Sequence, residues 1–349
     1  MKAPKLRFKE FNDEYVKLRY KDVLKIKSGK DQKQVENKNG KYPILGTGGQ
    51  IGKTNSFLYD KPSVLIGRKG TINKPQYMES PFWTVDTLFY SYIYEPNIPK
   101  YLFYSFQNVN WKKYDESTGV PSLSSSTIEN VECNIPSPNE QIKVANFLSL
   151  LDKKIELQSK KIEDLKLFKK RLSKYIFNLL TKYEKIKLGN ACDIVTGKLD
   201  ANAMVENGKY RFYTCAKEYY MIDKYAYDTE ALLISGNGAY VGYIHYYNGK
   251  FNAYQRTYIL HNFKYNVQYI KCYLDEYLSE KINLEKKDGN TPYIVLSTLS
   301  DMIIKIPSFF EQLKISKIIN ICNCKLEIEK NKLIKLKELK KGLMQNMFV

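Results

Sequence analysis

The feature that most constrains the architecture of this chain is an internal repeat. The segment 135–141 (IPSPNEQ) recurs at 306–312 (IPSFFEQ), so Glu140 corresponds to Glu311 at an offset of 171 residues. The same offset holds to the end of the sequence. Upstream the offset between the copies is about 168 residues. There SGK at 28–30 corresponds to TGK at 196–198, and VLIGRKG at 64–70 corresponds to LLISGNG at 232–238. The chain is therefore a tandem duplication of a unit of about 170 residues, with units too few and too long for a solenoid.

Each copy begins with a globular part that we expect to be α+β and rich in strands. Aromatic and β-branched runs bounded by Gly or Pro predict strands at 63–66, 87–92, 231–234 and 243–247. Short helices are expected at 99–106 and 267–278. An apolar fraction of 43%, with 30 Tyr and 16 Phe, is ample for packed cores and excludes wholesale disorder.

Each copy ends in a long helix with heptad spacing. Pro138 signals the start of the first helix, with Asn139 as a possible N-cap and Glu140 in the first turn. Its heptad positions are Leu148, Leu151, Ile155, Ile162, Leu165, Leu172, Ile176 and Leu179. At the repeat offset the second helix has Ile319, Cys322, Leu326, Leu333, Leu336, Leu343 and Met347. The interruptions coincide too, because Gln158 and Lys169 match Glu329 and Lys340.

Matching apolar seams in one chain predict that the two helices pair as a coiled coil. The alternative is that each helix packs on its own globular part. Because each helix follows a domain in the chain, the simplest pairing of the two helices is antiparallel. This pairing would place two β-rich, mixed α/β domains at opposite ends of a rod, as a tandem repeat with pseudo-two-fold symmetry. A seam of roughly 30 residues at about 1.5 Å per residue spans about 45 Å. One turn of B-DNA is about 34–36 Å, so such a protein should read a two-part site with an unread gap.

The charge of the chain points to a polyanionic partner. There are 56 Lys and Arg against 37 Asp and Glu, a formal net charge of +19. Membrane is the weakest candidate, since no apolar run approaches the length of a span and the basic N-terminus is not a secretory signal. The six cysteines form no CxxC pair and only two histidines exist, so we expect no metal site and reduced, cytoplasmic thiols.

Motifs that carry chemistry were sought and not found. The sequence has no Asn/Asp-Pro-Pro-Tyr/Phe loop of an amino-methyltransferase and no GxxxxGK[ST] motif of an ATP motor. Glycines at 46–52 and 236–242 have GxGxxxG spacing, and the second set precedes a strand rather than a helix, which favours β-turns or a DNA-facing loop over a nucleotide site. Asp86 is expected to be structural, and the lone His245 and His261 are not expected to be catalytic.

Several segments resemble the specificity subunits of type I restriction-modification enzymes. They are 4–11 (PKLRFKEF), 42–49 (YPILGTGG), 82–87 (FWTVDT), 119–124 (GVPSLS) and the segment 135–141 running into Leu150, Leu151 and Asp152, with its repeat at 306–312. Their order, their duplication and the heptad helices make the resemblance specific, and it covers nearly the whole chain. It departs from the family pattern at Tyr15, where Trp is frequent, and at Asn323, where the first copy has Asp152.

The resemblance implies a sequence-recognition subunit that catalyses nothing itself. Residues 1–138 and 184–309 would be target recognition domains, each for one half-site of double-stranded DNA, and 139–183 and 310–349 the conserved helices between them. Two methyltransferase subunits, and in the full enzyme two restriction subunits, would assemble around this chain. No cofactor is expected here, since S-adenosylmethionine, ATP and Mg would belong to the partner subunits.

Candidate DNA-contacting residues lie on glycine turns and polar loops, where the backbone can approach DNA and Arg, Lys or Asn can reach base edges or phosphates. In the first copy they are Arg68, Lys69, Thr71, Lys74, Ser117 and Thr118. In the second they are Asn237, Tyr240, Gln255, Arg256, Thr291 and Tyr293. The two turns differ in sequence, which predicts different half-sites. The alternative interpretation is that these are ordinary solvated loop residues with no DNA contact.

The long helices are also basic. The first carries Lys153, Lys154, Lys160, Lys161, Lys169, Lys170 and Arg171. Such a run is a solvated face, or it tracks the phosphates of the unread spacer.

Three other functions remain open. A stand-alone DNA-modifying enzyme would need the missing motifs. A non-catalytic coiled-coil scaffold that binds nucleic acid fits the charge and the duplication but not the ordered segments. An accessory or silent specificity subunit cannot be separated from a working one by sequence.

Overall fold

The computed structural model describes residues 4–285 and 293–349. The predicted contact residue Thr291 lies outside the described residues. The chain divides into two compact units. Unit 1 comprises Met1–Ser159 and Asn331–Val349, and unit 2 comprises Lys160–Lys330. In the described part of the chain, no helix combines the length and apolar character that a membrane span requires.

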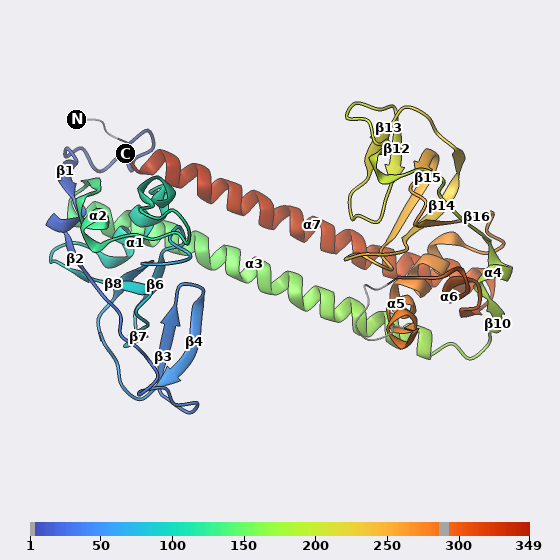
Figure 1. Ribbon diagram of the computed structural model, residues 1–349, viewed down its shortest axis with the longest axis horizontal. Coiled ribbons are helices and arrows are strands. Elements are labelled where there is room, and N and C mark those ends of the chain that lie inside the picture. Colours follow the sequence, from blue (N-terminus) through green and yellow to red (C-terminus); the bar gives the residue numbers. More distant parts are fainter. Residues whose placement is uncertain (1–3, 286–292) are drawn as a thin grey trace. The chain divides into compact units, whose positions relative to one another are not determined.

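Unit 1 contains three small sheets. The strands are β1 Val16–Arg19, β2 Leu24–Lys27, β3 Tyr42–Gly46, β4 Gly49–Thr54, β5 Ser63–Gly67, β6 Gln76–Met78, β7 Trp83–Thr84, β8 Leu88–Ile93 and β9 Glu132–Ile135. They pair in the orders β1-β9, β2-β8-β5-β6 and β4-β3-β7. The helical elements of the domain are η1 Tyr20–Asp22, α1 Pro99–Asn108, η2 Trp111–Tyr114 and α2 Ser125–Asn130. The β3–β4 hairpin extends away from the four-stranded sheet (Figure 1).

Unit 2 repeats this plan with one change. Its strands are β10 Glu184–Lys187, β11 Asp193–Thr196, β12 Tyr210–Tyr213, β13 Tyr220–Ile222, β14 Tyr227–Ser235, β15 Ile244–Ala253, β16 Thr257–His261 and β17 Ile303–Ile306. Its helical elements are α4 Leu188–Ala191, η3 Ala201–Ala203, α5 Val267–Glu285 and α6 Leu296–Ser300. The pair β10-β17 matches β1-β9, and the order β11-β16-β14-β15 matches β2-β8-β5-β6. The change is that β12 and β13 join the main sheet, through parallel pairing of β12 with β15.

A repeated glycine shows why the two copies fold alike. Gly29 lies against the backbone of Val85, and Gly197 lies against Ala253 in the same way. A Cβ atom at either glycine would collide with the neighbouring carbonyl oxygen. The repeated Ser/Thr-Gly-Lys motif is therefore a packing requirement of each unit.

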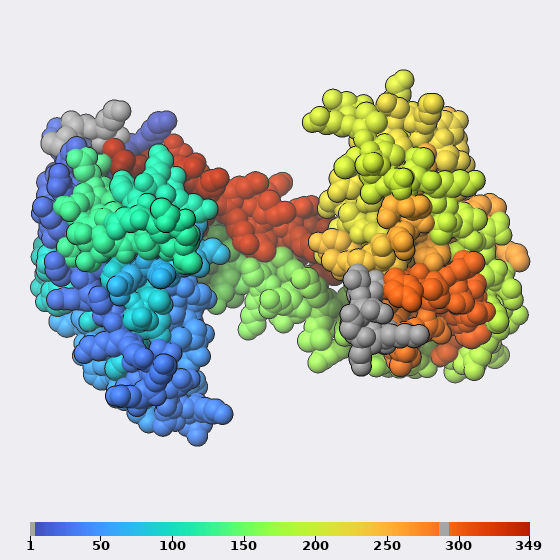
Figure 2. Space-filling view, viewed as in Figure 1, coloured from blue at the N-terminus to red at the C-terminus, as the bar shows by residue number. Residues whose placement is uncertain are grey.

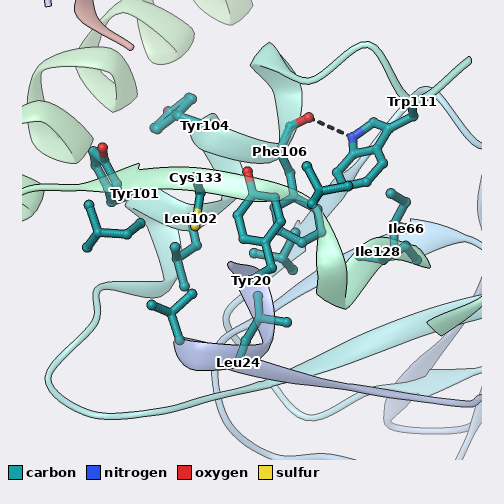
Figure 3. Packing of buried hydrophobic residues seen from close by; sticks show 14 of the residues in the cluster. Tyr20, Leu24, Ile66, Tyr101, Leu102, Tyr104, Phe106, Trp111, Ile128 and Cys133 are labelled. Atoms are coloured by element: carbon teal, nitrogen blue, oxygen red, sulfur yellow. Dashed lines mark hydrogen bonds between the residues drawn. The ribbon is translucent and has the colours of Figure 1, made fainter. Parts of the chain in front are cut away.

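Each unit has its own core. In unit 1 the largest cluster surrounds Tyr20, Phe106 and Trp111, whose indole Nε1 donates to the Phe106 carbonyl at 2.8 Å (Figure 3). In unit 2 the largest cluster surrounds Phe177 and Tyr269, whose rings meet edge to face. Both clusters enclose residues of the long helices, so these helices are integral to the units.

The long helices are α3, Pro138–Asn178, and α7, Phe309–Met347. The N-cap prediction for Asn139 was wrong by two residues, because α3 already begins at Pro138, which leaves Ser137 at the cap position. At α7 the cap is explicit. The Ser308 hydroxyl accepts from the Glu311 N–H at 3.3 Å and donates to the Glu311 carboxylate at 2.8 Å.

In each unit the two helices run antiparallel. In unit 1 the core gathers Val144 and Leu148 with Met344 and Met347, and Lys340 pairs with Asp152 at 2.6 Å one to two turns further along. Figure 2 shows the last turns of α7, in red, partly covered by unit 1 segments. In unit 2 the end of α3, at Phe177, shares a core with Ile315 and Ile319 of α7, while Lys161 pairs with Glu329 at 2.8 Å.

The predicted seam residues differ in burial. Five are buried, namely Leu148, Ile162, Ile319, Leu326 and Met347. Nine are half-buried, namely Leu151, Ile155, Leu165, Leu172, Ile176, Cys322, Leu333, Leu336 and Leu343. Leu179 was a wrong prediction, because it follows the end of α3 and is 58% exposed.

Candidate nucleic-acid interface

In unit 1 the predicted glycine turn is fixed to the predicted polar loop. The turn follows β5 and includes Gly70, whose φ of +95° suits glycine. The Gly70 N–H donates to the Pro121 carbonyl at 2.8 Å, and the Leu123 N–H donates to the Arg68 carbonyl at 2.9 Å. The backbone of the turn is thus rigid, while the side chains of Arg68 and Lys69 are exposed and Thr71 is half-buried.

The polar loop of unit 1 is organised around Asp115. Its carboxylate accepts from the Ser122 N–H at 2.9 Å and from the N–H and hydroxyl of Ser117 at 3.0 and 2.9 Å. These hydrogen bonds, led by the one from Ser122, hold the pKa of Asp115 below its usual value. Ser117 therefore has a structural task within the loop, whereas Thr118 is exposed beside it.

Unit 2 brings its own turn and loop together in the same way. Asn237 forms an antiparallel bridge with Tyr293, as Lys69 does with Ser122 in unit 1. The Ile294 N–H donates to the Gly236 carbonyl at 2.7 Å, and the Gly236 N–H donates to the Arg256 carbonyl at 2.9 Å. Three candidate positions, Lys69, Asn237 and Tyr293, therefore lie at the two bridges, which join segments far apart in sequence.

The remaining candidates of unit 2 differ in exposure and in the contacts that their side chains already make. Arg256 is exposed. The Gln255 amide donates to Asp200 at 2.9 Å and is committed there. Tyr240 is exposed and carries the Lys217 ammonium 5.1 Å from its ring centre. A cation over an exposed ring next to the glycine turn is suited to contact with a nucleic acid.

The sequence analysis missed an arginine held between aromatic rings in unit 2. The Arg211 guanidinium lies 4.3 Å from the ring centre of Tyr219 and 4.5 Å from that of Tyr247, and donates to the Tyr213 hydroxyl at 3.4 Å. The alternation of Tyr with Arg and Lys over 209–220 was the available signal, but the pairing of β12 with β15 that brings Tyr247 to Arg211 was not visible in it.

His245 has a structural role in unit 2. Its Nε2 lies 2.9 Å from the Ala216 carbonyl, which can only accept, so this nitrogen donates. Burial between Tyr213 and Tyr243 lowers the pKa of His245. A neutral, hydrogen-bonded ring holds the segment that carries Lys217. Among the described residues, no three His, Cys, Asp or Glu side chains gather as a metal ion would require.

Lys74 is the candidate that does not join the turn. It lies with three lysines of α7 along a cleft of unit 1. The other described candidates form one cluster in each unit, made of a glycine turn and a polar loop. The unit 1 cluster offers the exposed side chains of Arg68 and Lys69, and the unit 2 cluster offers exposed Arg256 beside half-buried Asn237, which suits contact with base edges and phosphates.

The family described as type I restriction modification DNA specificity domain matches residues 12–167 and again residues 181–338. The chain belongs to this family. Two DNA specificity domains in tandem confirm the resemblance and the duplicated α+β fold predicted from sequence.

Individual relatives are similar over different lengths. The type I restriction enzyme EcoDI specificity subunit of Escherichia coli is 33% identical over 163 residues, which is 47% of this chain and 36% of the relative. The match thus spans about a third of that relative's length. The S subunit of a type I restriction-modification system from M. genitalium is similar over 100% of this chain and 99% of its own, with a TM-score of 0.73 and 20% identity.

A further solved structure, described as showing complex assembly and conformational transition of the type I R-M system, has a TM-score of 0.59 and 13% identity over 96% of this chain and 98% of its own. At these identities the two structural likenesses concern the fold.

Proposed function

We propose that this chain is the DNA-recognition subunit of a type I restriction-modification enzyme and reads a two-part, asymmetric site. The observation that carries the proposal is the duplicated pairing of an exposed glycine turn with a polar loop, Lys69 with Ser122 and Asn237 with Tyr293. A formal charge of +19 supports attraction to the DNA backbone. The chain itself would catalyse nothing.

The two halves of the site should differ in sequence. The turn of unit 1 presents Arg68 and Lys69, which suit guanine and phosphate. The turn of unit 2 presents Asn237, which suits adenine, and Arg256 adjoins it. Thr71, Ser117, Thr118, Tyr240, Gln255, Thr291 and Tyr293 would complete the two contact surfaces.

The long helices would separate the two halves. In this proposal 1–138 and 184–309 are the recognition domains, and 139–183 and 310–349 are helices that pair as a coiled coil and set the spacer. A paired length of about 30 residues corresponds to about 45 Å, a little more than one turn of DNA.

The outer faces of the helices would dock the methyltransferase subunits. Exposed apolar side chains recur there at the repeat offset: Ile142 with Leu313, Leu150 with Ile321, Leu157 with Ile328 and Phe168 with Leu339. Apolar side chains that recur at intervals of seven, eight and eleven residues lie on one face of a helix. Two equivalent faces suit two copies of one partner, with S-adenosylmethionine on that partner and ATP and Mg on two restriction subunits, in the cytoplasm.

The test is selection of bound DNA from a random duplex pool, using this chain with its methyltransferase partner at near-physiological salt. Two short, different motifs at one fixed spacing would support the proposal. One motif alone would mean that one domain is silent, as in an accessory subunit. No enriched motif, with equal affinity for RNA, would favour a nucleic-acid-binding scaffold instead.

A further inference from the structure

Unit 1 contains a basic cleft where the recognition domain meets the end of α7. The cleft has a volume of about 470 Å³. Lys74 lines it from the domain, and Lys337, Lys340 and Lys341 line it from α7. The side-chain amides of Gln107 and Asn108, at the end of α1, complete its polar wall. Among the described residues that line this cleft there is no carboxylate.

Among the described residues, Lys340 is the one of the four lysines that pairs with a carboxylate of unit 1. Lys340 is 16% exposed, pairs with Asp152 at 2.6 Å, and donates to the Gln107 side-chain oxygen at 3.3 Å. The Tyr104 hydroxyl also donates to Asp152, at 2.8 Å, so this pair is a structural anchor. Lys74, Lys337 and Lys341 are exposed along the same cleft and leave it strongly positive.

Unit 2 contains an equivalent cleft whose charges are more balanced. Its volume is about 300 Å³, and it is lined by Lys166, Lys169 and Lys170 of α3. At the repeat offset these are the counterparts of Lys337, Lys340 and Lys341. The counterparts of the two amides are Asp275 and Glu276 of α5, which also line the cleft. In unit 1, Asp152 therefore offsets one of the four lysines. In unit 2, two carboxylates line the cleft with three lysines of α3, and one of them, Asp275, is also paired with Lys271 at 2.7 Å.

We propose that the unit 1 cleft binds the phosphodiester backbone of double-stranded DNA and that its unit 2 counterpart does not. Lysine ammonium groups are point charges that suit phosphate oxygens, and amides add neutral donors. Lys74 follows the turn of Arg68 and Lys69 by a few residues, so the cleft and the base-contacting turn belong to one segment. The recognition subunit thus anchors DNA asymmetrically, on the side of unit 1. This inference rests on the proposed function.

The experiment compares two double variants of the whole chain in complex with its methyltransferase partner. Lys337→Ala with Lys341→Ala removes exposed charge from the unit 1 cleft and spares the Lys340 anchor. Lys166→Ala with Lys170→Ala is the matched control in unit 2. Affinity is measured against salt for two duplexes, one with the selected site and one of random sequence.

Loss of phosphate contacts should lower the slope of log K against log salt by about 0.9 per contact, hence by about 2 for the unit 1 variant. The loss should be equal on both duplexes, and the bases selected should not change. The control should keep the parent slope. Equal losses in both variants, or no loss in the first, would overturn the proposal, and so would a loss confined to the selected duplex.

A second variant tests the role of cleft charge by adding carboxylates instead of removing lysines. Gln107→Asp with Asn108→Glu gives unit 1 the carboxylates of unit 2 and should weaken DNA binding in the same uniform way. Inorganic tripolyphosphate is the second probe. If it binds the parent, is lost in the Lys337/Lys341 variant, and DNA affinity is unchanged, the cleft is a site for free polyphosphate and the DNA proposal is wrong.

The two proposals fail separately. If the parent complex enriches no motif but the unit 1 variant still loses salt-dependent DNA binding, the cleft proposal is supported and the proposed sequence-recognition function is wrong. If motifs are enriched but the salt-dependence slopes of the variants equal that of the parent, only the cleft proposal is wrong.

Discussion

Glu140 and Glu311 are the same motif residue in two different environments. The Glu140 side chain is 1% exposed and accepts two hydrogen bonds from Arg7, at 2.9 and 2.8 Å, and one from the Tyr15 hydroxyl at 2.9 Å. Burial and this carboxylate together raise the pKa of Tyr15. Glu311 is half-buried and instead serves the helix cap with Ser308. The basic N-terminal segment of the resemblance therefore has a structural task in unit 1.

Replacing Arg7 should loosen the start of α3. Arg7→Met leaves a buried carboxylate without its cation, which costs about 3 kcal/mol at the low end for a broken buried pair. Hydrogen exchange over the first turns of α3 should report local opening that is easier by this amount. Glu311→Gln, in the exposed cap of α7, is the control and should change local opening far less. Equal protection of α3 in Arg7→Met and in the parent would contradict this account.

The cysteines should differ sharply in reactivity. Burial raises the pKa of Cys133, Cys192 and Cys272 to about 12 in each case. Cys324 is exposed. Alkylation of the native chain at pH 8 should therefore modify Cys324 and spare the three buried thiols until the chain is unfolded. Rapid modification of Cys133 in the native protein would mean that the unit 1 core is open.

Asn237 should affect only one half of the recognised site. Loss of a bidentate amide contact to a base costs about 1–3 kcal/mol of discrimination. In DNA selection, Asn237→Ala should blur one or two positions of one motif and leave the other motif intact. Asn207→Ala, at an exposed asparagine of unit 2, is the control and should change neither motif. Blurring of both motifs would show that the units do not read independently.

At the scale of elements, the strongest sequence motif is a glutamine clamp. The Gln141 amide donates to the Pro136 carbonyl at 3.0 Å, and its oxygen accepts the Ile98 N–H at 2.9 Å. Gln312 makes the same two contacts with Pro307 and Asn266, at 2.9 and 3.0 Å. In each unit the clamp joins the start of the long helix to the segment before the domain helix.

Each clamp should stabilise only its own unit. Gln141→Leu and Gln312→Leu each leave a backbone donor and acceptor unpaired, at a cost of about 1–3 kcal/mol for each buried group. Hydrogen exchange should show loss of protection in unit 1 for the first variant and in unit 2 for the second, so each serves as the control for the other. Equal loss in both units from either variant would argue against separate folding units.

Sequence periodicity located the elements because it records local burial. The helices at 99–106 and 267–278, and the strand at 63–66, lie within or nearly match α1, α5 and β5. Contacts between distant segments were not predictable in this way. The bridges from Lys69 and Asn237 depend on how loops close over a sheet, and the Arg211 cluster depends on which strand pairs with β12.

At the scale of the whole molecule, duplication supplies two similar units and small differences give them separate tasks. Asp152 anchors Lys340 in unit 1, whereas its counterpart Asn323 cannot, and the carboxylates of unit 2 lie on α5 instead. Sequence comparison flagged Asn323 as a departure, but only the arrangement of α1, α3 and α7 gives it a meaning. The two long helices themselves were predictable, because a heptad pattern needs no knowledge of the domains.

The central claim is that two recognition units are held at a distance set by the long helices. It is tested by inserting seven helix-forming residues between Ser159 and Lys160 and seven between Lys330 and Asn331, at the unit boundary of each helix. Seven residues lengthen a helix by about 10 Å, or about 3 base pairs of DNA. DNA selection with the lengthened chain and its partner should return the same two motifs with a spacer about 3 base pairs longer. An unchanged spacer, with both motifs retained, would contradict the claim that the helices measure the site.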